Sequence, residues 1–211
     1  QYIKDVYALR HTDGIEMERA SAGDAVLASH TDFKAYRSFE QKVAVHTALN
    51  LPVGHTLLIS LPTGGGKSLV TQLLSSVSNG LTIVIVPTVA LALDQYHAAN
   101  HNLKDNNGIF CYRGEQSDKE RTVIMNALKE KKAKILFTSP EAILKNPELH
   151  RILDDAAKNK YLANVVVDEA HVVPDWGVFF RPDFQIFSIL NIMIFKPHCF
   201  KPWRRSVFCR M

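Results

Sequence analysis

The residues best suited to chemistry in this chain form a glycine-rich segment, PTGGGKS, at positions 62–68. Glycines let backbone N–H groups turn inward without Cβ clashes, and such groups at the start of a helix attract phosphate. Lys67 would neutralise the outer phosphate oxygens of a nucleotide, and the Ser68 hydroxyl would bind Mg²⁺. The general pattern has glycine at position 61, where this chain has Leu61. The segment predicts a site for ATP and Mg²⁺ formed by Thr63, Gly64, Gly65, Gly66, Lys67 and Ser68; the alternative is a glycine-rich turn that leaves Lys67 exposed.

Two adjacent carboxylates, Asp168 and Glu169, follow the apolar stretch NVVV at positions 164–167. Phosphoryl transfer needs a positioned metal ion and an oriented nucleophile. Asp168 would hold Mg²⁺ through water, and Glu169 would orient and deprotonate the attacking water. His171 could sense the terminal phosphate and pass that state to neighbouring segments. The expected catalytic residues are therefore Lys67, Asp168 and Glu169, with Ser68 and Asp168 on the metal; the alternative is a charged exit from a strand.

Both groups need elements that bring them together, and the chain shows a regular alternation of predicted strands and helices. Short apolar runs predict strands, and apolar residues at helical spacing predict helices. Ser117 and Glu120 are typical of a capping box, and Asn146-Pro147 is typical of a helix start. Strands are expected at 56–61, 81–86, 109–112, 134–138 and 164–168, and helices at 35–49, 69–77 and 88–99 and after positions 117 and 146.

This alternation predicts an α/β fold with a parallel sheet covered by helices on both faces. Ligands of such sheets bind beyond the carboxyl ends of the strands, where the glycine-rich segment and the two acids both lie. We therefore expect Lys67 and the acids to converge on one triphosphate. In the helix at 35–49, the spacing predicts one face along Phe39, Val43 and His46.

The two motifs together resemble those of superfamily-two helicases, and the residues that follow narrow the resemblance. DEAH at 168–171 is followed at 176–184 by WGVFFRPDF, which resembles the aromatic-rich loop of the RecQ family, whereas VVPD at 172–175 departs from it. The resemblance implies the RecA-like P-loop NTPase domain of a 3′-to-5′ DNA helicase that couples ATP hydrolysis to strand translocation. In that family the loop contacts single-stranded DNA. The residues implied are Trp176, Phe180 and Arg181, which would stack on bases or contact phosphate; the alternative for Trp176 is a place in the core.

Two further segments resemble nucleic-acid-contacting motifs of the same family. They lie at 87–95 and 138–141. The resemblance implies that Thr88, Gln95 and Ser139 contact DNA, since hydroxyl, amide and backbone donors suit phosphate. The alternatives are helix packing for the first segment and a strand-end turn for the second.

The segment YRSFEQ at 36–41 resembles the adenine-reading motif that precedes the glycine-rich loop in this family. Gln41 would present its carbonyl and amide to the adenine edge, and Tyr36 or Phe39 would stack on the ring. Arg37 and Gln41 lie one residue further apart than is usual for the motif. The alternative is a glutamine on the surface of a helix.

Charge and composition limit the possible partners only weakly. The 211 residues have a net charge of +4, but residues 191–211 carry +5, so residues 1–190 sum to −1. The main body has no electrostatic preference for a polyanion, and DNA binding rests on the motifs. Three cysteines without a CxxC pair argue against disulfides or zinc and favour a reducing compartment, which is the cytoplasm and nucleoid of a bacterium or the nucleus of a eukaryote. No window approaches the roughly 18 apolar residues of a membrane span.

The expected organisation is an unassigned extension at 1–32, a helicase ATP-binding domain at 33–190 and an irregular basic tail at 191–211. The chain starts with Gln1, which suggests a start inside a longer protein, and no S-A-T motif follows the acids. The second RecA-like domain of such helicases is therefore expected to be missing, and the chain alone should bind ATP weakly and hydrolyse it poorly. The tail is interpreted either as a frameshift product or as a genuine basic extension that binds nucleic acid.

Three other functions stay open at this point. A helicase-like translocase of a defence or restriction system would carry the same motifs. A catalytically dead fragment would bind nucleic acid or nucleotide without turnover. A small-molecule P-loop kinase is the remote alternative, because residues 176–184 would have no role in it.

Overall fold

The computed structural model describes residues 20–62, 64–169 and 205–210. In these ranges, one parallel six-stranded sheet has the order β3-β8-β7-β4-β6-β5, and β1 (Ser21–Ala22) pairs antiparallel with β2 (Ala35–Tyr36). The strands of the larger sheet are β3 (Thr56–Ser60), β4 (Leu81–Ile85), β5 (Ile109–Tyr112), β6 (Ile135–Thr138), β7 (Leu162–Val167) and β8 (Arg205–Arg210). The helices are α2 (Ala25–His30), α3 (Phe39–Leu49), α4 (Lys67–Val77), α5 (Val89–Asn102), α6 (Asp118–Lys129), α7 (Pro140–Lys145) and α8 (Pro147–Lys158).

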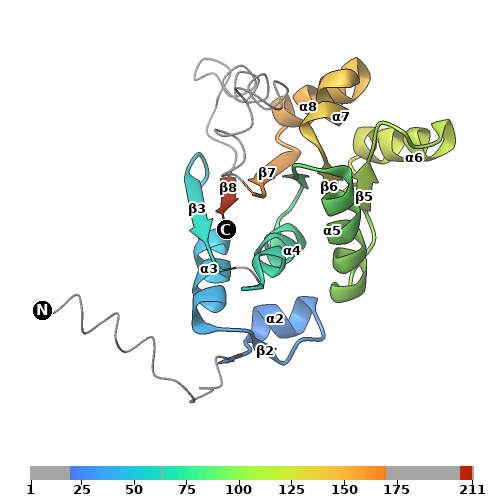
Figure 1. The fold of residues 1–211 in the computed structure, drawn as a ribbon. Coiled ribbons are helices and arrows are strands. Elements are labelled where there is room, and N and C mark those ends of the chain that lie inside the picture. Colours follow the sequence, from blue (N-terminus) through green and yellow to red (C-terminus); the bar gives the residue numbers. More distant parts are fainter. Residues whose placement is uncertain (1–19, 63, 170–204, 211) are drawn as a thin grey trace, which may run out of the picture.

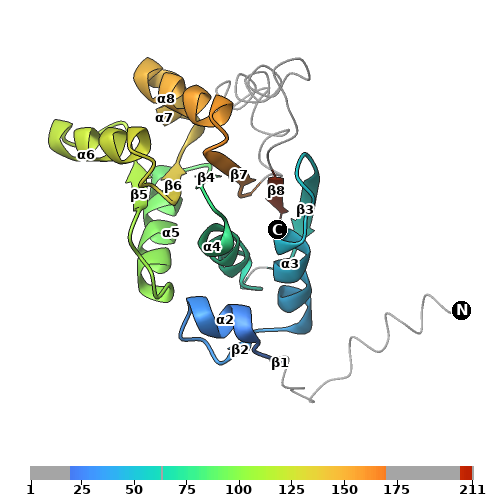
Figure 2. The same ribbon diagram turned by 180° about the vertical axis from the view of Figure 1, so that it is seen from behind.

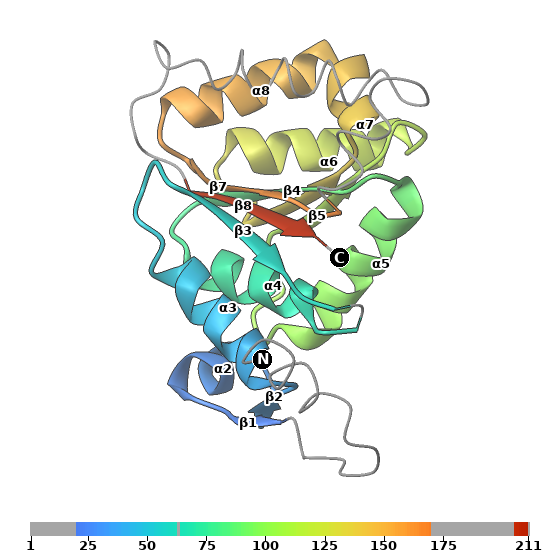
Figure 3. The ribbon, with the colours of Figure 1, turned by 60° about the vertical axis from the view of Figure 1, so that its left-hand side comes forward.

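Helices cover both faces of the larger sheet, with α6, α7 and α8 on one face and α3, α4 and α5 on the other (Figure 3). Successive residues of a strand point to opposite faces, so each strand contributes to two cores. On β7, Val166 packs in the core with α3, α4 and α5, whereas Val165 and Val167 pack in the core with α6, α7 and α8. Central strands are therefore mostly apolar: all five residues of β4 are buried, and its polar residue Thr82 accepts a hydrogen bond from Asn164 of β7 at 2.9 Å. The predicted α/β class with a parallel sheet covered on both faces is confirmed.

The face of α3 that packs inward differs from the predicted one. Gln41 and Val45 are buried, whereas Phe39 and Val43 are 66% and 46% exposed. The face along Phe39, Val43 and His46 that the spacing identifies is therefore not the face that packs inward. The Gln41 amide accepts the Arg37 backbone N–H and donates to the Gly66 carbonyl of the glycine-rich loop. These polar contacts lie on the buried side of α3, which apolar spacing alone does not identify.

The basic tail contains a strand where the sequence predicts none. Arg205–Arg210 forms β8, which lies between β3 and β7 and is parallel to both, with Phe208 opposite Leu58. A strand in this place pairs the backbone groups of two neighbours that would otherwise present open edges inside the sheet. The prediction of irregular structure is wrong for these residues, because backbone pairing decides the outcome and the basic composition does not oppose it. The rest of the tail lies outside the described residues.

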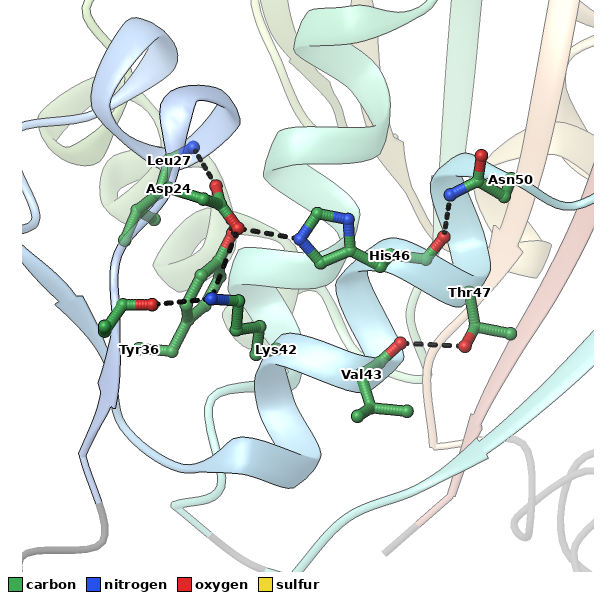
Figure 4. Close-up of polar contacts among 9 residues, drawn as sticks. Asp24, Leu27, Tyr36, Lys42, Val43, His46, Thr47 and Asn50 are labelled. Carbon is green, nitrogen blue, oxygen red and sulfur yellow. Dashed lines mark hydrogen bonds and ion pairs between the residues drawn. The ribbon is translucent and has the colours of Figure 1, made fainter.

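Residues 20–36 pack onto α3 through the carboxylate of Asp24 (Figure 4). Asp24 accepts hydrogen bonds from the Leu27 backbone N–H and the Tyr36 hydroxyl, each at 3.0 Å, and lies 2.7 Å from His46 Nε2. Leu27 and Tyr36 are fully buried in the core that α3 and α4 share. In Figures 1 and 2 this unit lies at the ends of α3 and α4 that are remote from the larger sheet. Residues on both sides of the expected boundary at 32–33 thus form one packed unit.

Replacing Asp24 by alanine is expected to lower the free energy of unfolding by about 1–3 kcal/mol, since it removes a helix cap and the contacts with the side chains of Tyr36, His46 and Lys42. Burial would raise the pKa of Asp24, but hydrogen bonds from the Leu27 N–H, His46 and Tyr36 outweigh it and hold that pKa below its usual range. The charged contribution is therefore complete above the pKa of about 4 that Asp has in unfolded chains, and it is lost as pH falls through the lower folded value. Urea unfolding at neutral pH and near pH 3 measures both effects.

Asp32→Ala is the matched control, because the Asp32 side chain is 92% exposed and only approaches Lys104 Nζ at 3.8 Å. It should change the free energy of unfolding little at either pH. The Asp24→Ala deficit should narrow at the lower pH. A deficit of equal size at both pH values would show that the charge of Asp24 does not contribute.

Candidate nucleotide-binding site

The glycine-rich loop leads from β3 into the first turn of α4. Gly64 and Gly66 have φ angles of 75° and 78°, a region in which residues with a Cβ are strained. A Cβ at Gly66 would also lie 2.0 Å from Gln41 Nε2. The Gly65 N–H donates to the Pro62 carbonyl at 2.8 Å, which closes the loop on itself. The glycines are therefore needed for the shape of the loop that precedes Lys67.

The two acids reach the same place from the end of β7. The Asp168 N–H donates to the Ile85 carbonyl at 2.9 Å, so the chain still runs beside β4 at this point. Lys67 Nζ lies 3.8 Å from Glu169 Oε1, and these side chains are only 12% and 16% exposed. Glu169 has a φ of 52°, a strained value that the surrounding structure must hold in place. The expected convergence of the lysine and the acids is observed.

These groups line one cavity of about 490 Å³, a size that suits a small ligand. The glycine-rich loop and the start of α4 form part of its lining, and the acids at the tip of β7 form another part. Helix α5 contributes a stripe of residues that follow helical spacing and therefore share one face. The stripe consists of Leu91, Asp94, Gln95, Ala98 and Asn102.

Gln95 connects this stripe to the first acid. Its Nε2 donates a hydrogen bond to Asp168 Oδ2, and Asp168 Oδ1 accepts the backbone N–H of Glu169 at 3.0 Å. Both oxygens of the Asp168 carboxylate therefore have a donor. The structure gives Gln95 a partner inside the cavity, and its predicted contact with DNA stays a prediction.

Gln41 lies against the glycine-rich loop and is 1% exposed. Its Oε1 accepts the Arg37 backbone N–H at 2.7 Å, and its Nε2 donates to the Gly66 carbonyl at 3.0 Å. The Arg37 guanidinium donates to the Gly64 carbonyl at 2.9 Å. Both ends of the Gln41 amide thus have backbone partners, and its predicted role in reading adenine stays a prediction. The contacts show that the segment resembling an adenine motif physically supports the loop.

Phe33 is the aromatic residue of this region that lines the cavity, and the sequence analysis did not identify it. It is 42% exposed. Tyr36 is fully buried and donates its hydroxyl to Asp24, so the predicted stacking of Tyr36 on a base is wrong. Phe39 is 66% exposed and does not line the cavity, so its predicted stacking is not supported. Three aromatic side chains lie within positions 33–39, and only the fold decides which one lines the cavity.

Two of the residues predicted to contact DNA cap helices. Thr88 is the N-cap of α5 and accepts the Leu91 N–H at 3.2 Å. Ser139 is the N-cap of α7 and is only 3% exposed. Their predicted DNA contacts stay predictions. The remaining predicted site residues, Thr63, His171, Trp176, Phe180 and Arg181, lie outside the described residues.

The donors at the cavity fit Mg²⁺. The Ser68 hydroxyl and the Asp168 carboxylate both line it. They are hard oxygen donors, and Mg²⁺ in nucleotide sites is typically held by one or two carboxylates, several waters and the phosphates themselves. Ser68 and Asp168 are therefore the residues that could hold the metal with the nucleotide.

Comparison with known proteins gives the family. Residues 39–199 match the profile of DEAD/DEAH box helicases. The chain is 38% identical over 144 residues to the ATP-dependent DNA helicase hus2/rqh1 of Schizosaccharomyces pombe, which covers 65% of this chain and 11% of that protein. It is 35% identical over 134 residues to the ATP-dependent DNA helicase RecQ of Synechocystis, which covers 64% of this chain and 27% of that protein. The chain thus spans well under a third of either relative.

The fold comparison agrees with the profile. The helicase MrfA, solved bound to DNA, superposes with a TM-score of 0.62 at 16% identity over 99% of this chain and 31% of that chain. At this identity the likeness shows the fold alone, which is that of RecA-like helicase domains. Among the helices of the described residues, none has the length and apolar character needed to cross a membrane. The predicted resemblance is confirmed: this chain belongs to the DEAD/DEAH box helicase family and is similar to its RecQ-type members.

Proposed function

We propose that this chain is the ATP-binding motor domain of a RecQ-like DNA helicase that works in the 3′-to-5′ direction. It binds ATP with Mg²⁺ and single-stranded DNA, and it couples hydrolysis to movement along the strand. The observation that carries the proposal is the 3.8 Å approach of Lys67 Nζ to Glu169 Oε1 at one cavity. The relatives named as ATP-dependent DNA helicases support the same function.

Each residue at the reactive end of the cavity has a defined task in this proposal. The N–H groups of the glycine-rich loop and the start of α4 bind the phosphates. Lys67 neutralises the oxygens of the outer two phosphates, and Ser68 and Asp168 would hold Mg²⁺, which would supply further positive charge beside them. Glu169 orients the attacking water and accepts its proton.

Two further residues of the cavity lining have side chains that suit a base. They are Phe33 and Arg37. An aromatic face and a planar guanidinium are suitable surfaces for stacking. Gln41 connects Arg37 to the glycine-rich loop, since its amide accepts the Arg37 backbone N–H at 2.7 Å and donates to the Gly66 carbonyl at 3.0 Å. Binding of the base would therefore act directly on the loop that holds the phosphates.

The proposed partners are single-stranded DNA and a second RecA-like domain. Trp176, Phe180 and Arg181 are the proposed stacking and phosphate contacts, and His171 is the proposed relay between them and the nucleotide. A second domain would close the cavity and supply an arginine, an effect of roughly 10³–10⁵ in rate. We therefore propose that the chain by itself binds nucleotide but hydrolyses it slowly.

Nucleotide binding and phosphate release, each measured with and without single-stranded DNA, test the proposal. We expect a fluorescent ATP analogue to bind in the presence of Mg²⁺, and the DNA to raise the slow release of phosphate. Trp176→Ala should remove the DNA response and leave nucleotide affinity unchanged, whereas Trp203→Ala, at the other tryptophan, should retain both.

Three results would contradict the motor function. Nucleotide and DNA binding without any phosphate release, even with a second RecA-like domain added, would indicate a binding module. Phosphate transfer to a small hydroxyl compound without a DNA response would indicate a kinase. DNA-dependent hydrolysis without strand displacement by a longer chain that includes the second domain would indicate a translocase.

A further inference from the structure

Gln95 is a polar residue of the cavity that has no task in the proposed mechanism. Its Nε2 donates to Asp168 Oδ2 across 73 positions of the chain. The other oxygen of this carboxylate accepts the Glu169 N–H at 3.0 Å. A carboxylate with a donor at each oxygen has a fixed orientation, while each oxygen keeps further acceptor capacity for water bound to a metal.

The packing of α5 explains how Gln95 reaches the tip of β7. Ala92 and Ala99, three residues before Gln95 and four after it, are 1% and 0% exposed in the core shared with the sheet. Residues at this spacing lie on one helical face, and small side chains there let the helix approach closely. The longer side chain of Gln95 extends from the same face to Asp168. Helix packing, and not chance flexibility at the surface, thus produces the contact.

We propose that Gln95 is a positioning residue for the metal-binding acid: its amide holds Asp168 in the orientation that receives the Mg²⁺ of bound ATP. The inference rests on the proposed function of the cavity. Residues that orient a metal-binding group through a hydrogen bond commonly change metal affinity about 10- to 100-fold when they are removed. Loss of the Gln95 amide therefore weakens the contribution of Mg²⁺ to nucleotide binding.

The same contact connects the metal site to the proposed DNA side of the domain. Helix α5 begins after Thr88, a proposed DNA contact, and Gln95 lies about 10 Å further along the helix axis. A shift of α5 that accompanies DNA binding would move the amide of Gln95 relative to Asp168. A movement of α5 would thus change the orientation of Asp168 through the hydrogen bond from Gln95.

The test compares the affinity for a fluorescent ATP analogue in excess Mg²⁺ with that in a chelator. The ratio of the two dissociation constants measures the coupling between metal and nucleotide. We expect Gln95→Ala to reduce this ratio about tenfold, while the affinity in chelator changes less than about twofold. Gln95→Met, which keeps the length of the side chain and lacks the donor, should give the same result if alanine disturbs folding.

Asn100→Ala is the matched control, because it removes a side-chain amide from the same helix that, within the described part of the chain, donates to the Tyr96 carbonyl at 2.8 Å and not to the acids. It should retain the full ratio. An unchanged Mg²⁺-to-chelator ratio in Gln95→Met would overturn the proposal, since the amide would then have no effect on metal binding. A larger ratio would also overturn it, since the amide would then compete with the metal for Asp168. Weaker DNA binding in Gln95→Met without nucleotide, with the ratio intact, would also overturn it and assign Gln95 to DNA.

The proposed function fails in a different way from this inference. If the wild-type chain binds the analogue no better than Lys67→Ala in excess Mg²⁺, the cavity is not a nucleotide site. If the wild-type chain binds the analogue with a clear Mg²⁺ dependence and Gln95→Met retains that dependence, only the role of Gln95 is lost.

Discussion

Lys67→Ala is expected to weaken binding of ATP with Mg²⁺ by roughly 10- to 100-fold and to bring phosphate release to background. A hydrogen bond to a charged group contributes about 1.5–3 kcal/mol, and each 1.4 kcal/mol is a factor of ten. The effect should fall near the upper end, because the Lys67 side chain is only 12% exposed and its charge is weakly screened there. Titration of a fluorescent ATP analogue measures the affinity, and release of inorganic phosphate measures turnover.

Lys119→Ala is the matched control for this prediction. Lys119 is an exposed residue of α6, on the face of the sheet opposite to α4. The Lys119→Ala variant should bind nucleotide with the affinity of the wild type. The thermal midpoints of Lys67→Ala and Lys119→Ala should both stay close to that of the wild type, which would show that the fold is retained. Equal nucleotide affinity in Lys67→Ala and Lys119→Ala would contradict the central assignment, since Lys67 would then be only a residue that neutralises Glu169.

Much of the fold could be predicted because local preference and tertiary packing agree in it. The buried strand β4 is rich in β-branched residues, with Thr82 as its one polar residue, and it forms within the expected range. Ser117 and Glu120 form the capping box that their spacing predicts, with each side chain bonded to the backbone of the other. Asn146 caps α8 as expected, and Pro147 occupies its first turn. Each of these features depends only on residues close together in the chain.

Prediction failed where a distant partner decides the conformation. The buried face of α3 contains Gln41, whose amide bonds to the Gly66 carbonyl, 25 positions away. No helical periodicity in the sequence contains that information. Strand β8 forms between two strands that are remote in sequence, so its own composition is a poor guide. The six-residue helix α2 depends on a cap whose carboxylate, Asp24, is also held by Tyr36 and His46.

The candidate site also contains features that follow from local sequence and features that depend on distant segments. The glycine-rich loop and the acid pair are contiguous, and their backbone shape follows from local residue types, so Lys67 and Glu169 could be brought together from sequence. The place of Phe33 in the cavity and the contact of Gln95 with Asp168 could not be predicted, because both depend on how separate segments meet. A signal for the wall formed by α5 does exist: the polar residues Asp94, Gln95 and Asn102 share a face at helical spacing with Leu91 and Ala98, and a mixed face of this kind is less suited to a packed core than to a ligand.

Glu169→Gln is expected to separate nucleotide binding from hydrolysis. The substitution keeps the size of the side chain but removes the negative charge, so it cannot accept a proton from the attacking water. Loss of a general base typically costs about 10²–10⁴-fold in rate. Affinity for ATP should stay equal or increase, because a carboxylate 3.8 Å from Lys67 no longer competes with the phosphates for that cation. Single-turnover phosphate release in the presence of single-stranded DNA measures the rate, and analogue binding measures the affinity.

Comparison of Glu169→Gln with Lys67→Ala distinguishes separate roles in binding and catalysis from a purely structural ion pair. If Lys67 and Glu169 were only an ion pair that stabilises the fold, both substitutions would lower the thermal midpoint and weaken nucleotide binding together. In the proposed roles, the lysine variant loses binding, whereas the glutamine variant keeps binding and loses turnover. Glu115→Gln, at an exposed position, should match the wild type in both measurements. Unchanged phosphate release in Glu169→Gln would show that another group activates the water, and it would leave the phosphate-binding role of the cavity to be judged by Lys67→Ala alone.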